Sequence, residues 1–338
     1  MNILAGDIGG TKTLLGLYDL NGNISKLHQK KYVSYQWESL ESIITDFLDC
    51  IPKNYNYPKM GCLALAGPVI NGISSITNLG WTITEKNIKE IAGLDKLELV
   101  NDIKILIYGI PYLNPEQFVQ IQSNKLQNLS YETIAVIAAG TGLGMAKGLC
   151  HKNTILAFPS EGGHREFAIR TKQEWRLVKW LKNDLNLERI SIERIVSGNG
   201  LGHIARWRLS QADAMVHPLR KVSEEWKYKK QNCPDLPALV SKAAKNGDGL
   251  MEEVLQIWLS AYGCAAGDLA LQELCHGGLW IAGGTAGKNL QGIRSATFLE
   301  AFKRKGRFHE YLENLPVMVL IDPEAGLFSA ACRARMLA

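Results

Sequence analysis

The sequence lacks the cysteine patterns that would indicate an exported or metal-bound fold. Its cysteines are odd in number and scattered, and no C-x-x-C pair occurs, so we expect neither a disulfide framework nor a zinc site. They are Cys50, Cys62, Cys150, Cys233, Cys264, Cys275 and Cys332. No cationic leader precedes Asp7, so we expect no signal peptide. Together these absences predict a protein of the reducing cytoplasm.

Long apolar runs and an excess of one charge are also absent. The most apolar stretch, 261–271, contains Asp268 and is too short to span a bilayer. The net charge is only +5, and the densest basic stretches, 165–182 and 206–230, are interleaved with acids and tryptophans. We interpret these stretches as solvated helix faces rather than a nucleic-acid footprint. At 338 residues the chain is too long for one simple core, so we expect two domains.

What the sequence does contain is glycine at the ends of apolar runs. The first case, 3–18, reads as a β-hairpin with Asp7, Gly9, Gly10 and Thr11 at its tip. Glycine amides suit an oxyanion such as phosphate, and an aspartate beside them suits a hydrated Mg²⁺. The P-loop pattern fails here, because Thr11 stands where its second glycine belongs and a strand follows instead of a helix. Taken alone, the tip is better explained as a plain tight turn.

The first 110 residues or so alternate strands and helices, which is typical of an α/β unit. Asn21-Gly22 predicts a hairpin turn, and the last strand delivers Asn101 and Asp102 to a helix start. The expected strands cover 26–34, 60–66, 76–81 and 97–100, and the expected helices cover 37–50, 85–92 and 101 to about 108. Prolines 111 and 115 mark a hinge.

A second unit repeats the strand-then-glycine pattern. The run 134–139 ends in Gly-Thr-Gly-Leu-Gly at 140–144, and a strand resumes over 145–149. After a mainly helical region from 171 to 274, a strand over 278–282 ends in Gly283-Gly284. A last strand over 317–321 precedes a helix for which we expect Asp322 as N-cap and Pro323 at the first helical position. Three such glycine turns in two α/β units indicate a nucleotide cleft between two halves.

Six motifs, in order along nearly the whole chain, resemble those of the sugar kinases of the actin, hexokinase and Hsp70 superfamily, and most closely the bacterial glucokinase family. They are Gly-Asp-Ile-Gly-Gly-Thr (6–11), Leu-Val-Asn-Asp (99–102), Gly-Thr-Gly-Leu-Gly (140–144), Glu-Gly-Gly-His (161–164), Glu-Arg-Ile-Val-Ser-Gly (193–198) and Ile-Ala-Gly-Gly (281–284). The closing stretch 305–337 matches as well. The resemblance implies two actin-like (ribonuclease H-like) α/β domains with a nucleotide and sugar cleft between them. The small domain would comprise 1–112 and 322–338, and the large domain 113–321.

The resemblance also implies an activity, the ATP-dependent phosphorylation of glucose to glucose 6-phosphate in glycolysis, by a cytoplasmic homodimer that uses ATP and Mg²⁺. Asp102 matches the family's catalytic base, although Asn101-Asp102 could instead only cap a helix. Two alternatives stay open: a kinase for another hexose such as mannose, fructose or an N-acetylhexosamine, and a sugar-sensing regulatory protein on the same scaffold. No membrane or nucleic-acid partner is expected.

The site residues follow from the matched motifs. Those implied for the sugar are Asn78, Asn101, Asp102, Glu161, His164 and Glu193. Those implied for ATP are Gly6, Asp7, Ile8, Gly9, Gly10, Thr11, Gly140, Thr141, Gly142, Gly283 and Gly284, with Asp7 also near Mg²⁺ through water. Glu161 and His164 could also be read as a metal pair, but the two glycines between them favour a loop.

Three features depart from the family or are not matched by it. The Cys-rich zinc motif of the related repressor and open-reading-frame kinases is missing. Thr285 follows Gly283-Gly284 without the expected proline. The helical region 205–237, with Trp226 among lysines, matches no motif. Trp81, near the matched Asn78, is at least as well explained as a core residue.

Overall fold

The computed structural model describes residues 1–21, 24–122, 132–152, 154–228 and 233–338. They form two compact units. The first unit comprises Met1–Phe118, Ala146–Pro159 and Asp322–Ala338, and the second comprises Val119–Met145 and Ser160–Ile321. Gly22 of the expected Asn21-Gly22 turn lies outside the described residues.

The sheet of the first unit has the strand order β3-β2-β1-β4-β8. β1 (Asn2–Ile8) pairs antiparallel with β2 (Lys12–Asp19), which forms the expected hairpin, and β2 pairs antiparallel with β3 (Ser25–Val33). β4 (Met60–Leu65) runs parallel to both β1 and β8 (Lys96–Asn101). The register aligns Ile8 with Leu65 and Leu65 with Asn101. The carboxyl ends of three parallel strands therefore meet at one edge, where ligands bind in open α/β sheets.

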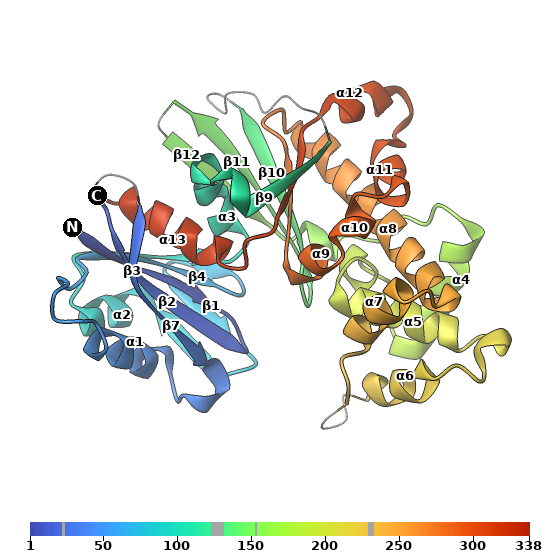
Figure 1. Cartoon of the computed structure of the whole chain (residues 1–338), viewed down its shortest axis with the longest axis horizontal. Coiled ribbons are helices and arrows are strands. Elements are labelled where there is room, and N and C mark those ends of the chain that lie inside the picture. The colour runs from blue at the N-terminus through green and yellow to red at the C-terminus, as the bar shows by residue number, and fades with distance from the viewer. Residues whose placement is uncertain (22–23, 123–131, 153, 229–232) are drawn as a thin grey trace. The chain divides into compact units, whose positions relative to one another are not determined.

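Helices cover both faces of this sheet (Figure 1). α1 (Leu40–Asp49) and α2 (Glu85–Ala92) lie on one face, and α3 (Lys104–Gly109) and α13 (Ala325–Arg335) lie on the other. Leu4 and Ile8 point into one core with Ile43 and Phe47 of α1, because alternate residues of a strand share a face. The expected helix over 37–50 is shorter than predicted, because Ser39 acts as its N-cap and accepts a hydrogen bond from the Ser42 amide at 3.2 Å.

The expected strand over 76–81 is wrong. A small sheet of three antiparallel strands occupies this region: β5 (Val69–Ile70), β6 (Ile73–Ile76) and β7 (Trp81–Thr84). The chain turns between β6 and β7, where the Leu79 amide donates to the Ile76 carbonyl at 3.0 Å and Gly80 has φ +69°. Trp81 is 7% exposed and belongs to the core, while Asn78 lies at the tip of the turn.

The start of the last helix also differs from the prediction. α13 begins at Ala325, and its N-cap is Glu324, which makes no side-chain capping bond. Asp322 instead accepts a hydrogen bond from the Glu324 amide at 2.8 Å and another from the Gln117 side chain at 2.5 Å. Asp322 therefore forms a side-chain turn ahead of the helix rather than capping it.

A six-stranded sheet has the order β12-β11-β10-β13-β14-β9. Its central strand β13 (Leu279–Ala282) runs parallel to β10 (Thr133–Ala139) and to β14 (Val317–Leu320). The outer strands are β9 (Phe118–Gln122), β11 (Leu143–His151) and β12 (Thr154–Ser160). Glycine follows both β10 and β13, as predicted, and the two strands are neighbours, so the turns after them are close together.

Apart from its strands, the second unit is mostly helical. The helices are α4 (Lys172–Leu185), α5 (Gly198–Leu209), α6 (Leu219–Lys227), α7 (Leu236–Lys245), α8 (Gly249–Glu273), α9 (Gly284–Lys288), α10 (Leu290–Ile293), α11 (Ala296–Lys303) and α12 (His309–Asn314). The apolar stretch 261–271 belongs to the longer helix α8, whose 25 residues would suffice to cross a membrane by length and composition alone. The most apolar window of α8 is 61% buried inside the protein, and Trp258 and Tyr262 are wholly buried, so it serves as a core helix here.

Candidate active site

The tip of the β1–β2 hairpin is held by a residue that the sequence did not single out. The Gly9 amide donates to the Lys12 carbonyl at 2.9 Å and closes the turn. The Ser34 hydroxyl donates to the Gly9 carbonyl at 2.9 Å, and the Ser34 amide donates to the Thr11 carbonyl at 3.0 Å. Ser34 is fully buried. It therefore fixes the tip from below and leaves the outer side of the glycine turn open.

Two of the predicted ATP residues lie deeper than the tip. Gly6 and Ile8 are buried within β1, and a Cβ on Gly6 would lie 2.6 Å from Leu63. Gly10, by contrast, faces Asn78, since a Cβ there would lie 3.7 Å from the Asn78 amide nitrogen. The structure thus brings Asn78 to the glycine tip and places Gly6 and Ile8 in the core of the sheet.

Asp7 lies at the end of β1 with a carboxylate that burial destabilises. Its pKa is raised above the ordinary aspartate value by burial, which the positive charge of Lys12 only partly offsets. Gly326 of α13 approaches closely, because a Cβ there would lie 3.0 Å from Asp7 Oδ2. Within the described ranges, no cluster of three or more histidine, cysteine or acidic side chains is arranged to hold a metal. A single, partly buried carboxylate whose charge Lys12 only partly balances fits a cation whose other ligands are water and phosphate, as Mg²⁺ prefers.

The structure distinguishes the contacts of Asn101 from those of Asp102, which the sequence alone could not do. The side-chain oxygen Oδ1 of Asn101 accepts hydrogen bonds from the Ile103 and Lys104 amides, each at 3.0 Å, and so closes a side-chain turn ahead of α3, whose N-cap is Ile103. Its amide nitrogen donates to the Gly67 carbonyl at 3.1 Å and to Asp102 Oδ1 at 2.9 Å. Asn101 thus closes the turn before α3 and holds the carboxylate of Asp102 in position.

The Asp102 carboxyl titrates near neutrality. Its pKa is raised to about 6, first by burial and then by the negative charge of Asp7. Hydrogen bonds from nearby backbone amides and from Asn101 oppose this rise. A carboxylate with this pKa is mostly ionised at pH 7 and still basic enough to accept a proton, which is the balance that a general base needs.

The second glycine turn, in the second unit, is held from two sides. The Gly140 amide donates to the Gly142 carbonyl at 2.9 Å. The Gly140 carbonyl accepts from the Gly198 amide at 2.8 Å and from the Thr285 hydroxyl at 3.3 Å. The turn is therefore tied both to the start of α5 and to the Gly283-Gly284 loop. The predicted Thr141 lies exposed at its tip.

Glu193 supports this same turn. One of its carboxylate oxygens, Oε2, accepts a hydrogen bond from the Leu143 amide at 2.9 Å, and it lies so close to Gly142 that a Cβ there would be 2.5 Å away. The sequence offered only the family resemblance for Glu193. The structure shows a contact to the glycine turn and leaves the other oxygen, Oε1, for further hydrogen bonds.

Glu161 and His164 lie together on a short 3-10 turn, η4 (Gly162–His164). His164 Nε2 is 3.6 Å from Glu161 Oε2, and the two side chains are 59% and 75% exposed. Gly163 is required inside this turn, since a Cβ there would lie 2.2 Å from the Leu143 carbonyl oxygen. The motif therefore packs directly behind the second glycine turn and presents an imidazole and a carboxylate to solvent.

Thr285 is the residue at which this chain departs from the expected family sequence, and its hydroxyl ties the Gly283-Gly284 loop to Gly140. Replacing it by valine removes one hydrogen bond at nearly constant volume, so we expect the KM for ATP to rise about 2- to 10-fold with little change in the KM for sugar. Initial-rate kinetics over both substrates measure this. Thr133→Val, which removes a similar bond to the Leu274 carbonyl, should leave both KM values unchanged. An equal effect of the two substitutions would contradict the role of Thr285.

The glycine turns after parallel strands, and the partly buried Asp102 at the carboxyl edge of a sheet, are the features expected of a sugar kinase with the two-domain actin-like fold. The Glucokinase family model matches residues 4–337, and the glucokinase of Trichormus variabilis is 38% identical over 344 residues, covering 99% of each chain. The chain belongs to the glucokinase family.

Solved structures agree with this assignment. A glucokinase from an Antarctic psychrotroph is 28% identical, with a TM-score of 0.82 over 99% of both chains. A ROK family glucokinase from Streptomyces griseus, in complex with glucose and AMPPNP, shares the fold at 19% identity, with a TM-score of 0.62 over 99% of this chain and 100% of that one. The fold class and the family predicted from the six motifs are confirmed.

Proposed function

We propose that this chain transfers the γ-phosphoryl group of ATP to the 6-hydroxyl of glucose, with Asp102 as the base that receives the hydroxyl proton. The observation that carries the proposal is Asp102 itself, a carboxylate oriented by Asn101 at the sheet edge and tuned to a pKa of about 6. A base of this kind contributes about 10²- to 10⁴-fold to the rate.

The glycine turns supply hydrogen-bond donors for the phosphates in this proposal. The backbone amides of Gly10 and Thr11 lie on the tip that Ser34 holds from below, and those of Thr141 and Gly142 lie on the tip that Glu193 and Thr285 hold. Because these backbone N–H donors are already held in position, they can stabilise the charge on the transferring phosphoryl group without a rearrangement of the protein. When bound, Mg²⁺ would neutralise phosphate charge, and Asp7 is the residue whose buried carboxylate fits it.

Sugar hydroxyls both donate and accept, so the residues proposed to hold them are of mixed type. Glu161 and His164 offer exposed polar groups behind the second turn, and Glu193 offers its second oxygen. We propose that these three side chains hold hydroxyl groups of the sugar.

A panel assay tests the proposed reaction. Purified protein with Mg-ATP is incubated with glucose, mannose, fructose and N-acetylglucosamine in turn, and ADP release is followed. We expect ADP release that depends on glucose. Faster release with another hexose would replace glucose as substrate, and no release with any hexose would favour a regulatory protein on this scaffold.

The pH dependence of the reaction tests the role of Asp102 separately. The base must be ionised to accept a proton, so kcat/KM for glucose should rise with pH through an apparent pKa of about 6 and level off above pH 7. Initial rates at limiting glucose and saturating Mg-ATP between pH 5 and pH 8 measure the profile. A rate that stays constant between pH 5 and pH 7 would contradict this assignment.

We also propose a cytoplasmic homodimer, as the family resemblance implies. Light scattering coupled to size-exclusion chromatography gives the mass in solution, and a value near one chain of 37.4 kDa would rule the dimer out.

A further inference from the structure

A groove of about 640 Å³ in the second unit takes no part in the proposed reaction. It lies between α4, the C-terminal half of α5 and the start of α8, and it is formed by the tryptophan-containing basic stretches that the sequence analysis assigned to solvated helix faces. Three indole rings line it, those of Trp175, Trp180 and Trp207. A helix face that only contacts solvent does not need three tryptophans around one groove, so the groove is a candidate site for a ligand.

The indoles present apolar area inside a polar groove. Trp175 is 53% exposed, an unusual state for so large a side chain, and Trp207 on the facing helix is 6% exposed. Lys179 Nζ lies 5.3 Å from the centre of the Trp175 ring, and the Arg206 guanidinium carbon lies 5.3 Å from the centre of the Trp180 ring. Cation–π attraction therefore helps to hold both rings in place. Rigid aromatic faces of this kind suit a ligand that has an apolar face and a polar rim.

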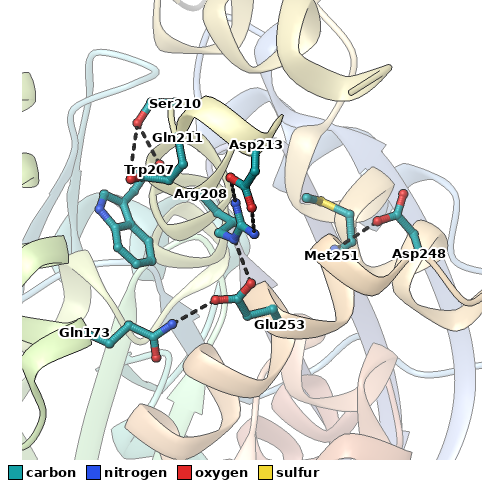
Figure 2. A network of polar contacts seen from close by, with 9 residues as sticks. All are labelled: Gln173, Trp207, Arg208, Ser210, Gln211, Asp213, Asp248, Met251 and Glu253. Carbon is teal, nitrogen blue, oxygen red and sulfur yellow. Dashed lines mark hydrogen bonds and ion pairs between the residues drawn. The ribbon is translucent and has the colours of Figure 1, made fainter. Parts of the chain in front are cut away.

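The wall beside the indoles is a fixed polar network (Figure 2). Arg208 donates from both terminal nitrogens to Asp213, at 2.8 and 2.7 Å, and from Nε to Glu253 at 2.7 Å. Gln173 donates to the other oxygen of Glu253 at 2.9 Å. A carboxylate oxygen can accept two hydrogen bonds, so the oxygens of Asp213 and Glu253 keep lone pairs for a ligand's hydroxyl groups.

The charges of the groove nearly cancel. Arg208 is 8% exposed, and its single positive charge forms ion pairs with two carboxylates, those of Asp213 and Glu253. That wall therefore carries a net charge of one negative unit. Arg176 and Lys179 line the side formed by α4. A phosphate near the acidic wall would be repelled, whereas a neutral ligand rich in hydroxyls meets acceptors on one side and donors on the other.

We propose that this groove is a second, non-catalytic binding site for a neutral saccharide. The ring face of a sugar would stack on Trp175, and its hydroxyls would bond to the wall of Gln173, Asp213 and Glu253. The groove lies near the C-terminal end of α5, whose first residue, Gly198, bonds to the second glycine turn. A 12-residue helix is about 18 Å long, so the groove is separate from that turn.

Titration calorimetry with maltotriose and cellotriose tests the proposal. Saturating glucose is present throughout, so that any catalytic sugar site is filled and the result does not depend on the proposed reaction. We expect one of the two trisaccharides to bind to the wild-type protein. Trp175→Ala should weaken that binding about fivefold or more, because a stacked aromatic contact is lost.

Tyr228→Ala is the matched control. Tyr228 is 68% exposed and also carries a lysine over its ring, Lys227 at 5.6 Å, but it lies outside the groove. Its removal should leave the affinity unchanged. The proposal is overturned if neither trisaccharide binds, if Trp175→Ala binds as tightly as wild type, or if inorganic phosphate or glucose 6-phosphate displaces the bound trisaccharide, which would make the groove an anion site.

Discussion

Asp102→Asn is expected to lower kcat about 10²- to 10⁴-fold while glucose still binds. Asparagine keeps the shape of the side chain and its hydrogen-bonding capacity toward Asn101, so the geometry of the α3 start is preserved. It cannot accept the hydroxyl proton, so only the chemical step is lost. Steady-state rates and glucose titration of the same preparation measure both effects. Retention of a tenth of the wild-type kcat would refute the assignment of the base.

The same substitution is expected to raise stability at neutral pH. Because the folded-state pKa of Asp102 is raised to about 6, ionising it costs the folded protein free energy above that pH, and the cost disappears below pH 4, where the folded and unfolded forms are both protonated. Wild-type stability should therefore fall as pH rises from about 4 through 6, and Asp102→Asn should lack this fall. A shift of this size corresponds to roughly 1–3 kcal/mol at pH 7. Denaturant unfolding at several pH values measures it.

Asp46→Asn is the control for removing a carboxylate. The pKa of Asp46 is held below its ordinary value by hydrogen bonds from Lys30 and Tyr32, at 2.7 and 2.8 Å. Ionised Asp46 therefore stabilises the folded protein, and Asp46→Asn should lower the free energy of unfolding at pH 7, whereas Asp102→Asn should raise it. If both variants lost stability, Asp102 would be a structural residue rather than a strained base.

Gly283→Ala is expected to destabilise the protein by about 2–5 kcal/mol and to raise the KM for ATP. Gly283 has φ +93°, a conformation that residues with a Cβ rarely adopt. A Cβ there would lie 2.4 Å from the Ala139 carbonyl oxygen, which is backbone and can yield only if β10 shifts. That strand leads into the Gly140 turn, so the strain would reach the proposed phosphate donors.

The adjacent glycine gives the matched control. Gly284 begins α9 and has no atom within 4 Å of an added Cβ. Gly284→Ala should leave the free energy of unfolding within about 0.5 kcal/mol of wild type. Thermal or denaturant unfolding of the two variants measures the difference, and equal stability of the two would show that the backbone at Gly283 is not constrained.

Local pattern predicted most of the elements near the site. The runs before Gly9 and after Thr11 are short, apolar and separated by glycines, which predicts a hairpin, and the structure has that hairpin. The helix over 85–92 was predicted to the residue, since Thr84 caps it and Gly93 ends it. The pattern failed over 76–81, where the positive φ of Gly80 reverses the chain inside what reads as one extended run.

The supporting residues of the site could not be found in this way. The hydroxyls of Ser34 and Thr285 donate hydrogen bonds to carbonyls 25 and 145 positions away in the sequence. A serine after a strand and a threonine after two glycines occur in many unrelated settings, so neither residue carries a local signal of its role. Asp322 shows the reverse failure: it has the sequence of a helix cap, but its hydrogen bonds form a turn before the helix.

The sequence by itself determined the family, the α/β character and the order of the glycine turns, because these depend on residue types at short spacing. Only the tertiary structure decided that the Asn101 side chain closes a turn ahead of α3 and bonds to the Asp102 carboxylate, and that Glu193 supports the second glycine turn. It also decided that the charge of Asp7 raises the pKa of Asp102, 95 positions away in the sequence, at one sheet edge. The physical reason is that burial and charge coupling depend on which strands are neighbours, and strand order is set by packing of the whole unit rather than by any local stretch.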